Sequence, residues 1–308
     1  MKSGNKTIAF ILIAVLALGA TSCLKPHASD TPSAAIAQDR EGNPITLPKK
    51  MDRVISLGPS NTEILAALGF ADKIVAADAY SGGIEGLADD IPLFSMMAPD
   101  GERILRLEPD VIFVTGMSKV GGVDQFKIVS DAGICVLYIP SSSTIADIKA
   151  DITFIAEIMG NAEKGGKIIA EMEEVIGKIT RIADTITDRK TVYFEISAES
   201  FLYSFGRGVF LNEMLEIIGA ENILVDRKQW VSVTGEAILA KNPDVILTNN
   251  GHIDNPVDDI MARPGWNALK AVQNGDVHYI DTATSSRPSH NIVRALQEMA
   301  KAVYPDKY

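Results

Sequence analysis

Short apolar runs alternate with amphipathic stretches through the first half of the chain. Because the runs are apolar throughout and show no period of two, they are typical of strands buried on both faces of a parallel sheet. Helices are expected between them, and Gly69 and Pro109 end the first two. The alternation predicts an α/β N-terminal lobe over residues 51–143. The predicted strands cover 53–58, 73–78, 110–115 and 134–139, and the predicted helices cover 61–68 (with Asn61 as N-cap), 101–107 and 126–132.

The middle of the chain, residues 144–187, has a helical pattern and no strand signal. Ser143 or Thr144 can cap a first helix, and Asn161 can cap a second that runs to about Ile186. In the second helix, Ile, Val and Met residues recur at helical spacing with charged residues between them. A helix of about 25 residues is about 38 Å long at ~1.5 Å per residue. This segment is therefore predicted to be a helical linker that includes one long backbone helix.

The alternation of strands and helices resumes after the linker and predicts a C-terminal lobe over residues 188–308. Its strands are again short and apolar, as expected for a second covered sheet. The predicted strands cover 191–197, 244–248 and 277–280, and the predicted helices cover 211–218, 235–241 and 289–303.

The two halves of the chain contain an internal repeat. Glu, Ile, Leu, Pro, Asp, Val and Ile recur at identical spacing in Glu102–Ile112 and Glu236–Ile246. Weaker matches pair 63–69 with 213–219 and 133–139 with 275–280, in the same order. A helix followed by Pro-Asp and a strand is common in α/β proteins, but three ordered pairs favour duplication. Two similar lobes would direct the loops beyond the carboxyl ends of their strands into one ligand cleft.

The N-terminus has the layout of a secretory signal peptide over residues 1–22. Lys2 and Lys6 precede an uncharged apolar run, 8–20, which is too short to span a bilayer. Small residues then lead to Cys23, an arrangement that resembles the bacterial lipobox, although Ala20 stands where that motif prefers Leu. The resemblance implies lipidation of Cys23, and the alternative is an ordinary cleaved signal with an incidental cysteine.

Residues 23–50 are predicted to form a lipidated tether and a short edge strand, because Pro, Ala, Ser, Thr and Asp dominate without sustained periodicity. The predicted location is the cell envelope on the extracytoplasmic side, where the lipid would hold the chain to the membrane.

Charge and motif content narrow the classes of function. The net charge is −11, and no cluster of Lys and Arg is dense enough to follow phosphates, so nucleic acid is not an expected partner. Cys135 is the only cysteine of the predicted lobes, so we expect a small core residue and neither a disulfide framework nor a Cys/His metal site. The chain lacks a Gly-x-Ser-x-Gly elbow and a phosphate-binding loop. No enzymatic activity and no resident cofactor are predicted.

Three segments together resemble the ABC-importer substrate-binding proteins for cobalamin, ferric siderophores and haem. They are Arg53–Gly69, Leu107–Ile112 and Arg263–Val277, and the resemblance extends over roughly residues 50–305. It implies two Rossmann-like α/β lobes joined by a single long helix, with the ligand cleft between them and a small hinge movement. The implied partners are a permease dimer with its ATPase and a metal chelate or corrinoid ligand that itself contains iron or cobalt. The protein is expected to act as a monomer.

The repeat-related Glu102 and Glu236 match the surface glutamates by which this family docks onto arginines of the permease. Two symmetrically placed carboxylates suit two basic pockets on a dimeric transporter. The alternative is that each glutamate is only a favourable charge in the first turn of its helix.

The residues predicted to bind the ligand come from loops that follow strands. Aromatic side chains provide flat apolar faces for a large planar or chelated ligand, and the alternative for each aromatic residue is packing in a core. The predicted residues are Pro59, Ser60, Asn61, Tyr80, Met96 and Thr115 in the first lobe, and Tyr203, Arg207, Trp230 and Arg287 in the second.

The sequence leaves the ligand open among siderophore, cobalamin and haem. Met96 stands where the cobalamin binders carry an aromatic residue. Haem coordination by His290 or by a tyrosine is an alternative, and a directly bound free metal ion is not favoured, because it needs several convergent ligands. A ligand-sensing module or adhesin that is not coupled to transport is a further alternative.

Overall fold

The computed structural model describes residues 36–119, 123–199 and 201–308. The predicted signal peptide, the predicted lipidation site Cys23 and the first part of the predicted tether lie outside these residues. Among the helices of the described part, none is both long and apolar enough to cross a membrane.

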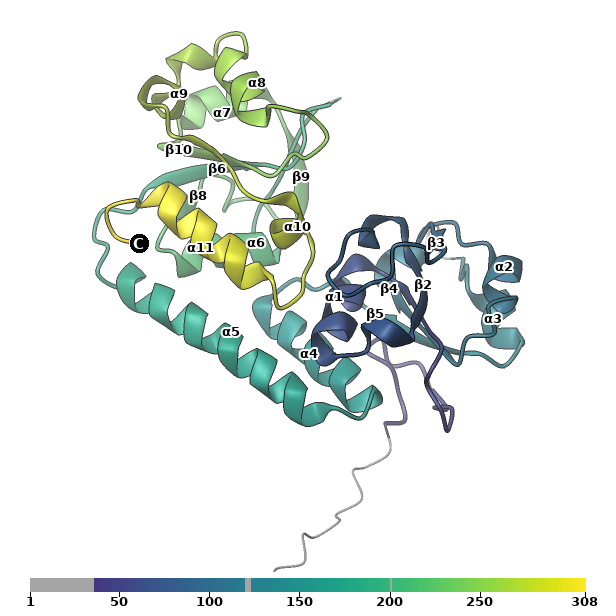
Figure 1. The fold of residues 1–308 in the computed structure, drawn as a ribbon. Helices are drawn as coiled ribbons and strands as arrows, with labels where there is room; N and C mark the ends of the chain where they lie inside the picture. The colour runs from purple at the N-terminus through teal and green to yellow at the C-terminus, as the bar shows by residue number, and fades with distance from the viewer. Residues whose placement is uncertain (1–35, 120–122, 200) are drawn as a thin grey trace, which may run out of the picture. The chain divides into compact units, whose positions relative to one another are not determined.

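The N-terminal lobe carries the labels α1 to α3 and β2 to β5 in Figure 1. It is built on a parallel sheet with the strand order β3-β2-β1-β4-β5. Val54 and Phe113 face the core that contains α1 and α4, whereas Ile55 and Val114 face a second core with residues of α2 and α3. Burial on both faces explains why the strands are apolar throughout. The elements are β1 (Val54–Leu57), α1 (Pro59–Leu68), η1 (Ala71–Lys73), β2 (Ile74–Asp78), η2 (Ala79–Ser81), β3 (Leu93–Phe94), α2 (Gly101–Leu105), β4 (Val111–Thr115), η3 (Gly116–Ser118), α3 (Lys127–Asp131) and β5 (Cys135–Ile139).

The C-terminal lobe has a second parallel sheet with the order β11-β10-β6-β8. Phe194 and Leu247 face the large core shared with the linker helices, and Tyr193 and Ile246 face a separate core around Trp266. The elements are β6 (Thr191–Glu195), β7 (Leu202–Phe205), α6 (Phe210–Ile217), β8 (Glu221–Asn222), β9 (Trp230–Val233), α7 (Gly235–Lys241), β10 (Val245–Thr248), α8 (Pro256–Ala262), η5 (Trp266–Ala268), α9 (Lys270–Asn274), β11 (Val277–Tyr279), α10 (Thr282–Ser286) and α11 (Ile292–Val303).

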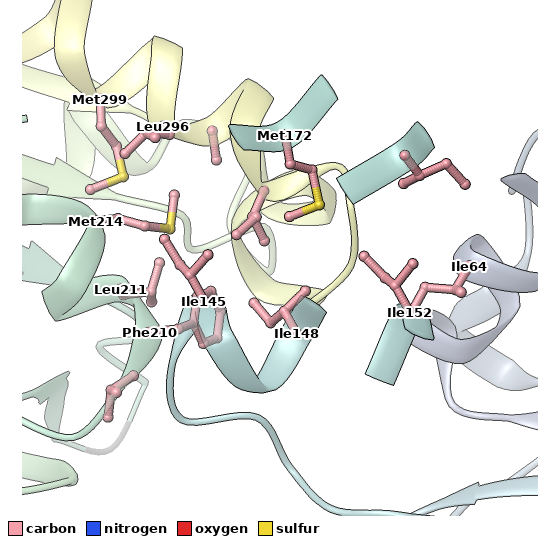
Figure 2. Close-up of a cluster of buried hydrophobic side chains, with 14 of the residues drawn as sticks. Ile64, Ile145, Ile148, Ile152, Met172, Phe210, Leu211, Met214, Leu296 and Met299 are labelled. Carbon is pink, nitrogen blue, oxygen red and sulfur yellow. The ribbon is translucent and has the colours of Figure 1, made fainter. Parts of the chain in front are cut away.

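Two helices link the lobes, α4 (Ile145–Ile158) and α5 (Ala162–Ala183). Thr144 and Asp147 form a reciprocal capping box at the start of α4. The 22 residues of α5 span about 33 Å at ~1.5 Å per residue. Figure 2 shows α4 contributing Ile145, Ile148 and Ile152 to the shared core, with residues of α5, α6 and α11 around them. The predicted fold class, two parallel-sheet lobes joined by a long helix, is confirmed.

The structure repeats the same geometry at the two matching sequence segments. Glu108 and Asn242, each before the Pro-Asp pair, both have a positive φ of 46°. The N–H of Asp110 donates to the carbonyl of Arg53, and the N–H of Asp244 donates to the carbonyl of Thr191. Each aspartate thereby joins two parallel strands at their amino ends. The strand order β2-β1-β4-β5 corresponds to β8-β6-β10-β11, which supports the duplication inferred from sequence.

The predicted edge strand within residues 23–50 is wrong for the described part of that segment, residues 36–50. Its backbone forms only an isolated bridge between Gln38 and Pro44. The buried Asp39 holds a turn by accepting hydrogen bonds from the N–H groups of Glu41 and Asn43. The other oxygen of Asp39 accepts from the N–H of Tyr138 in β5 at 3.0 Å. The Asp39 side chain, and not a further strand, thus accepts the hydrogen bond of Tyr138 at this edge of the sheet.

Several predicted boundaries also shift for local reasons. Helix α1 begins at Pro59 with Gly58 as N-cap, not at Asn61, because proline suits the first helical position. Gly69 ends that helix in the left-handed conformation, as predicted. The side chain of Asn161 donates to the carbonyl of Leu68 instead of capping α5. Helix α5 ends at Ala183 rather than near 186, where i→i−3 hydrogen bonds replace the helical ones.

Cys135, predicted to be a core residue, lies at the start of β5 and is only half-buried. Burial, with the nearby Asp39 carboxylate, raises the pKa of its thiol to about 11. The thiol therefore stays protonated at neutral pH and packs against the large core as a small apolar group.

Candidate ligand-binding site

A cavity of about 570 Å³ is lined by residues that follow strands in both lobes. Thr115 ends β4, Ile139 ends β5, Ile196 follows β6 and Asn249 follows β10. This is the place where parallel α/β sheets bind ligands, and the volume is typical of small-molecule sites. Loops at the carboxyl ends of strands in both lobes therefore meet at one cavity.

Eight of the ten predicted ligand-binding residues line this cavity. Tyr80 and Arg207 do not: the Tyr80 side chain is exposed, and Arg207 pairs through its backbone with Arg227 and Gln229. The eight are Pro59, Ser60, Asn61, Met96, Thr115, Tyr203, Trp230 and Arg287. Polar lining residues that sequence reasoning missed are Ser141, Ser142, Asp151, Asn249, Ser285 and Ser286.

Two aromatic rings form one wall of the cavity. Tyr203 and Trp230 lie nearly parallel, with ring centroids 6.1 Å apart and an interplanar angle of 13°. They come from the antiparallel pair β7 and β9, and Phe205 packs its ring edge to face against Trp230 at 6.0 Å. Trp230 remains 43% exposed, so the alternative of simple core packing does not describe it. The wall offers a flat apolar surface to a ligand.

Asn61 places a buried amide at this cavity. Its side chain is 2% exposed, and Nδ2 has no hydrogen-bond partner among the described residues. A Cβ atom at Gly58 would lie 2.3 Å from Thr115 Cγ2 and 3.3 Å from Asn61 Nδ2, so glycine leaves room for both side chains. An unpaired buried donor is costly, and a ligand oxygen that accepts from it would remove that cost.

Asp151 of α4 also lines the cavity and is nearly fully buried. The Arg40 Nε donates to its Oδ1 at 2.7 Å, and the Ser142 hydroxyl donates to Oδ2 at 2.7 Å. Burial raises the pKa of Asp151, against the opposing effect of these donors. The described start of the chain thus contributes Arg40 to the polar lining through Asp151.

Asp78, at the end of β2, is fully buried and close enough to Arg287 to interact with its charge. Its Oδ1 accepts from the Tyr80 N–H at 2.6 Å, and Oδ2 has no partner among the described residues. Burial raises the pKa of this carboxyl to about 6, although the Tyr80 N–H and Arg287 oppose the shift.

Replacing Asp78 with Asn is expected to stabilise the protein at pH 7.5 by up to about 2.7 kcal/mol, the equivalent of about two pKa units. Because the folded pKa is raised, the stability contributed by the aspartic acid is complete below about pH 4 and is lost as pH rises through about 6. The advantage of Asp78→Asn should therefore vanish at pH 4. Urea unfolding at both pH values measures it, with the exposed Asp131→Asn as control. An equal difference at both pH values would contradict the prediction.

Glu102 and Glu236 lie at equivalent positions, each the second residue of a short exposed helix. Asp100 caps α2 and Thr234 caps α7, and each accepts a hydrogen bond from the backbone N–H three residues later. The Glu236 carboxylate also accepts from its own N–H and from the Thr234 hydroxyl, which lowers its pKa. Both carboxylates remain exposed to solvent, where a partner can reach them.

His290, the histidine considered as an alternative ligand of haem iron, does not line this cavity. His290 borders a second cavity of about 620 Å³, and burial lowers its pKa. His278 lies in β11, and burial also lowers its pKa. Among the described residues, no group of three or more His, Cys, Asp or Glu side chains is placed to hold a metal ion.

The fold and the cavity define a two-lobed ligand-binding protein. The periplasmic binding protein family matches residues 54–284, and the chain belongs to that family, as the sequence predicted. The chain is 30% identical over 275 residues to the ABC transporter substrate-binding lipoprotein YvrC of Bacillus subtilis (strain 168), itself uncharacterised, with 88% of this chain and 85% of YvrC covered. It is 28% identical over 227 residues to the vitamin B12-binding protein of Yersinia pestis (strain Pestoides F), with 71% and 76% covered.

Solved structures with the same fold include a possible iron-binding periplasmic protein of Staphylococcus epidermidis. It is 27% identical, with a TM-score of 0.74, and the match covers 83% of this chain and 100% of that one. The haem-binding protein HutB of Vibrio cholerae has a TM-score of 0.74 at 23% identity, over 82% of this chain and 99% of that one. At that identity HutB supports the fold alone.

Proposed function

We propose that this protein binds a corrinoid or a ferric siderophore outside the cytoplasm and delivers it to an ABC importer. The observation that carries the proposal is the apolar cavity between the lobes, walled on one side by Tyr203 and Trp230. Membership of the periplasmic binding protein family supports a transport role, and the relatives named for B12 and iron support the ligand class. A lipid on Cys23 would keep the protein at the membrane, and the name of the relative YvrC as a lipoprotein supports this part of the proposal.

The chemistry of the lining favours a bulky chelate over a small polar solute. Apolar and aromatic groups supply most of the contact surface, and buried polar groups such as Asn61 and Asp151 supply orientation. A chelate brings its metal already coordinated, so the protein needs only apolar contact and a few hydrogen bonds. We therefore expect the metal to be cargo within the ligand.

Haem is the second candidate, on one specific observation. Tyr203 lines the cavity, and a tyrosine oxygen is an established axial ligand of haem iron. A role in ligand sensing or adhesion without transport is distinguished by uptake: deletion of the gene would then leave ligand import intact.

The two tryptophans of the chain make a direct binding test possible. Trp230 borders the cavity, whereas Trp266 is 2% exposed and packs against Tyr193 in a separate core. In a Trp266→Phe variant, cyanocobalamin, a ferric hydroxamate, a ferric catecholate and hemin should be titrated separately while Trp230 fluorescence is followed. Saturable quenching by a corrinoid or siderophore supports the proposal, quenching by hemin alone supports the alternative, and no binding of any probe contradicts both.

Trp230→Ala is expected to weaken binding of the active probe about tenfold to hundredfold, equivalent to about 1.5–3 kcal/mol. The loss follows from removing half of the stacked aromatic wall, so Trp230→Phe should retain most of the affinity. Calorimetric titration gives the dissociation constants. Equal affinity of Trp230→Ala and the parent protein would remove Trp230 from the site.

A further inference from the structure

A buried glutamate on α1 of the N-terminal lobe binds one segment of the C-terminal lobe. Glu63 is 7% exposed, and its carboxylate accepts side-chain hydrogen bonds from Arg287, Ser289 and Asn291. Arg287 Nη1 lies 2.9 Å from Oε1, and Asn291 Nδ2 lies 3.0 Å from Oε2. The segment 287–291 joins α10 to α11, and we call these four side chains the Glu63 clamp.

The clamp explains the late start of α11. The sequence pattern predicts helix over residues 289–291, but α11 begins at Ile292. The Ser289 hydroxyl donates to Glu63 and accepts from the N–H of Asn291, so the segment forms a turn across the lobe boundary. Bonds to the other lobe thus replace the first turn of the predicted helix.

Arg287 is bound to the N-terminal lobe a second time, because Nη2 donates to the carbonyl of Tyr80 at 2.7 Å. The residues on either side of it, Ser286 and Pro288, line the ligand cavity together with Arg287 itself. On the other side of the clamp, α1 contributes Ser60 and Asn61 to the same cavity. The clamp therefore ties two walls of the cavity to each other, one from each lobe.

Charge makes this interaction stronger than a neutral one. The Arg287 and Glu63 side chains are 20% and 7% exposed, so water screens the ion pair weakly. A buried carboxylate with several donors is held in one geometry, and loss of one partner leaves an unpaired buried charge. We expect the relative position of the two walls to depend on this group.

The duplicated helix α6 carries the matching glutamate. Glu213 accepts a hydrogen bond from the N–H of Ile145, the first residue of α4, at 2.8 Å. Phe210 and Leu211, also in α6, line the ligand cavity. The two glutamates occupy the same position of the repeat, and each contacts a segment outside its own sheet: Glu63 contacts residues 287–291, and Glu213 contacts the start of α4. Of these two glutamates, Glu63 pairs with a cation across the lobes, whereas Glu213 accepts from a neutral backbone group of the linker.

We propose that Glu63 is a positioning residue for the ligand site: by holding Arg287, Ser289 and Asn291 it fixes the separation of the two cavity walls. It touches no ligand and acts on affinity through preorganisation of the walls. The effect on affinity rests on the proposed function, whereas the effect on lobe separation does not.

Spin labels measure the lobe separation directly. Asp131→Cys on α3 and Gln273→Cys on α9 are exposed sites in different lobes, introduced with Cys23→Ser and Cys135→Ser. Adding Glu63→Ala should broaden the distribution of distances between the labels about twofold. Glu63→Gln should fall between it and the parent, because glutamine keeps an acceptor and loses the charge. Glu85→Ala, an exposed glutamate of the same lobe, is the control and should leave the distribution unchanged.

Affinity is the second measurement, with cyanocobalamin as probe and Trp230 fluorescence as readout. Glu63→Ala should bind about tenfold more weakly. Adding Glu63→Ala to Arg287→Ala should cause a smaller further loss than Glu63→Ala causes in the parent protein, because Arg287 is one of the three donors to Glu63. An unchanged distance distribution, or a broadened one with unchanged affinity, overturns the proposal. If Glu63→Ala does not fold, both the label distances and the affinity are measured on Glu63→Gln instead. If the parent protein binds no cyanocobalamin, the corrinoid assignment fails, and the label distances still decide whether the clamp fixes the walls.

Discussion

Replacing Glu102 and Glu236 together with alanine is expected to abolish ligand uptake by whole cells and to leave ligand affinity unchanged. Both carboxylates are exposed and lie outside the lining of the ligand cavity, so their loss does not touch the bound ligand. They are related by the internal repeat, and each sits in the first turn of its helix, α2 or α7. We infer that they meet basic pockets on the two permease subunits, where charge-assisted hydrogen bonds would hold the complex. Uptake of labelled ligand and calorimetry on the purified variant provide the two measurements.

The alternative role of these glutamates predicts a different result. A first-turn charge that only favours its helix contributes about 0.3–1 kcal/mol to stability, and its removal would leave uptake intact. Glu163→Ala is a suitable control, because Glu163 is an exposed acidic residue in the first turn of α5. Normal uptake by the double variant would exclude docking through these residues, and a loss of affinity would place them in the ligand site.

Arg263→Ala is expected to lower the free energy of unfolding by about 3–5 kcal/mol, because it leaves the buried Glu195 carboxylate without its charged partner. Glu195 is 1% exposed at the end of β6, and Arg263 binds both of its oxygens, at 2.7 and 3.0 Å. The guanidinium also lies over the ring of Trp266 at 4.3 Å, and the same substitution removes this cation–π interaction. Urea unfolding followed by far-ultraviolet circular dichroism measures the change.

A second substitution separates the energetic cost of the unpaired Glu195 charge from the cost of the packing lost with the Arg263 side chain. In the double variant Arg263→Ala with Glu195→Gln, the buried group is neutral, and most of the lost stability should return. The single variant Asp259→Ala serves as control, since Asp259 is half exposed and its bond to Arg263 contributes little. A loss below about 1 kcal/mol in Arg263→Ala would show that Glu195 does not depend on this partner.

Much of the scaffold could be predicted because parallel strands buried on both faces have a plain sequence pattern. Strands β1, β4 and β10 are fully apolar or nearly so, and helix α5 shows helical spacing of its apolar residues. Gly69 and Thr144 indicate the correct helix boundaries, since their roles are set by local backbone geometry. Local chemistry of this kind does not depend on distant parts of the chain.

The pattern fails where long-range interactions decide the conformation. The sequence pattern extends the predicted strand to residue 197, but Ile196 and Ser197 leave the sheet and pair with Tyr203 of β7. The antiparallel strands β7 and β9 are short, and they carry aromatic residues rather than a regular alternation. Residues 289–291 are held by Glu63, a residue far away in sequence. Such pairings have no signature in a local window.

The candidate site is predictable to the extent that strand ends can be located. Thr115 and Arg287 are found because they follow strands, and Trp230 is found through its resemblance to aromatic residues of the family. Asp151 is missed because it lies within α4, where a charged residue suggests an exposed helix face. Its buried carboxylate pairs with Arg40, which comes from a different part of the chain.

The aromatic wall belongs to a part of the molecule that the duplication does not repeat. Gly58 alone separates β1 from α1, whereas residues 196–209, which include β7, separate β6 from α6. Strands β7 and β9 form a sheet of their own, apart from the two parallel sheets. The aromatic wall that we propose for ligand binding is therefore an addition to the duplicated scaffold, so it could be exchanged while the two parallel sheets are kept. Grafting β7 and β9 from a relative with another ligand would retain the sheets, the clamp and the exposed glutamates.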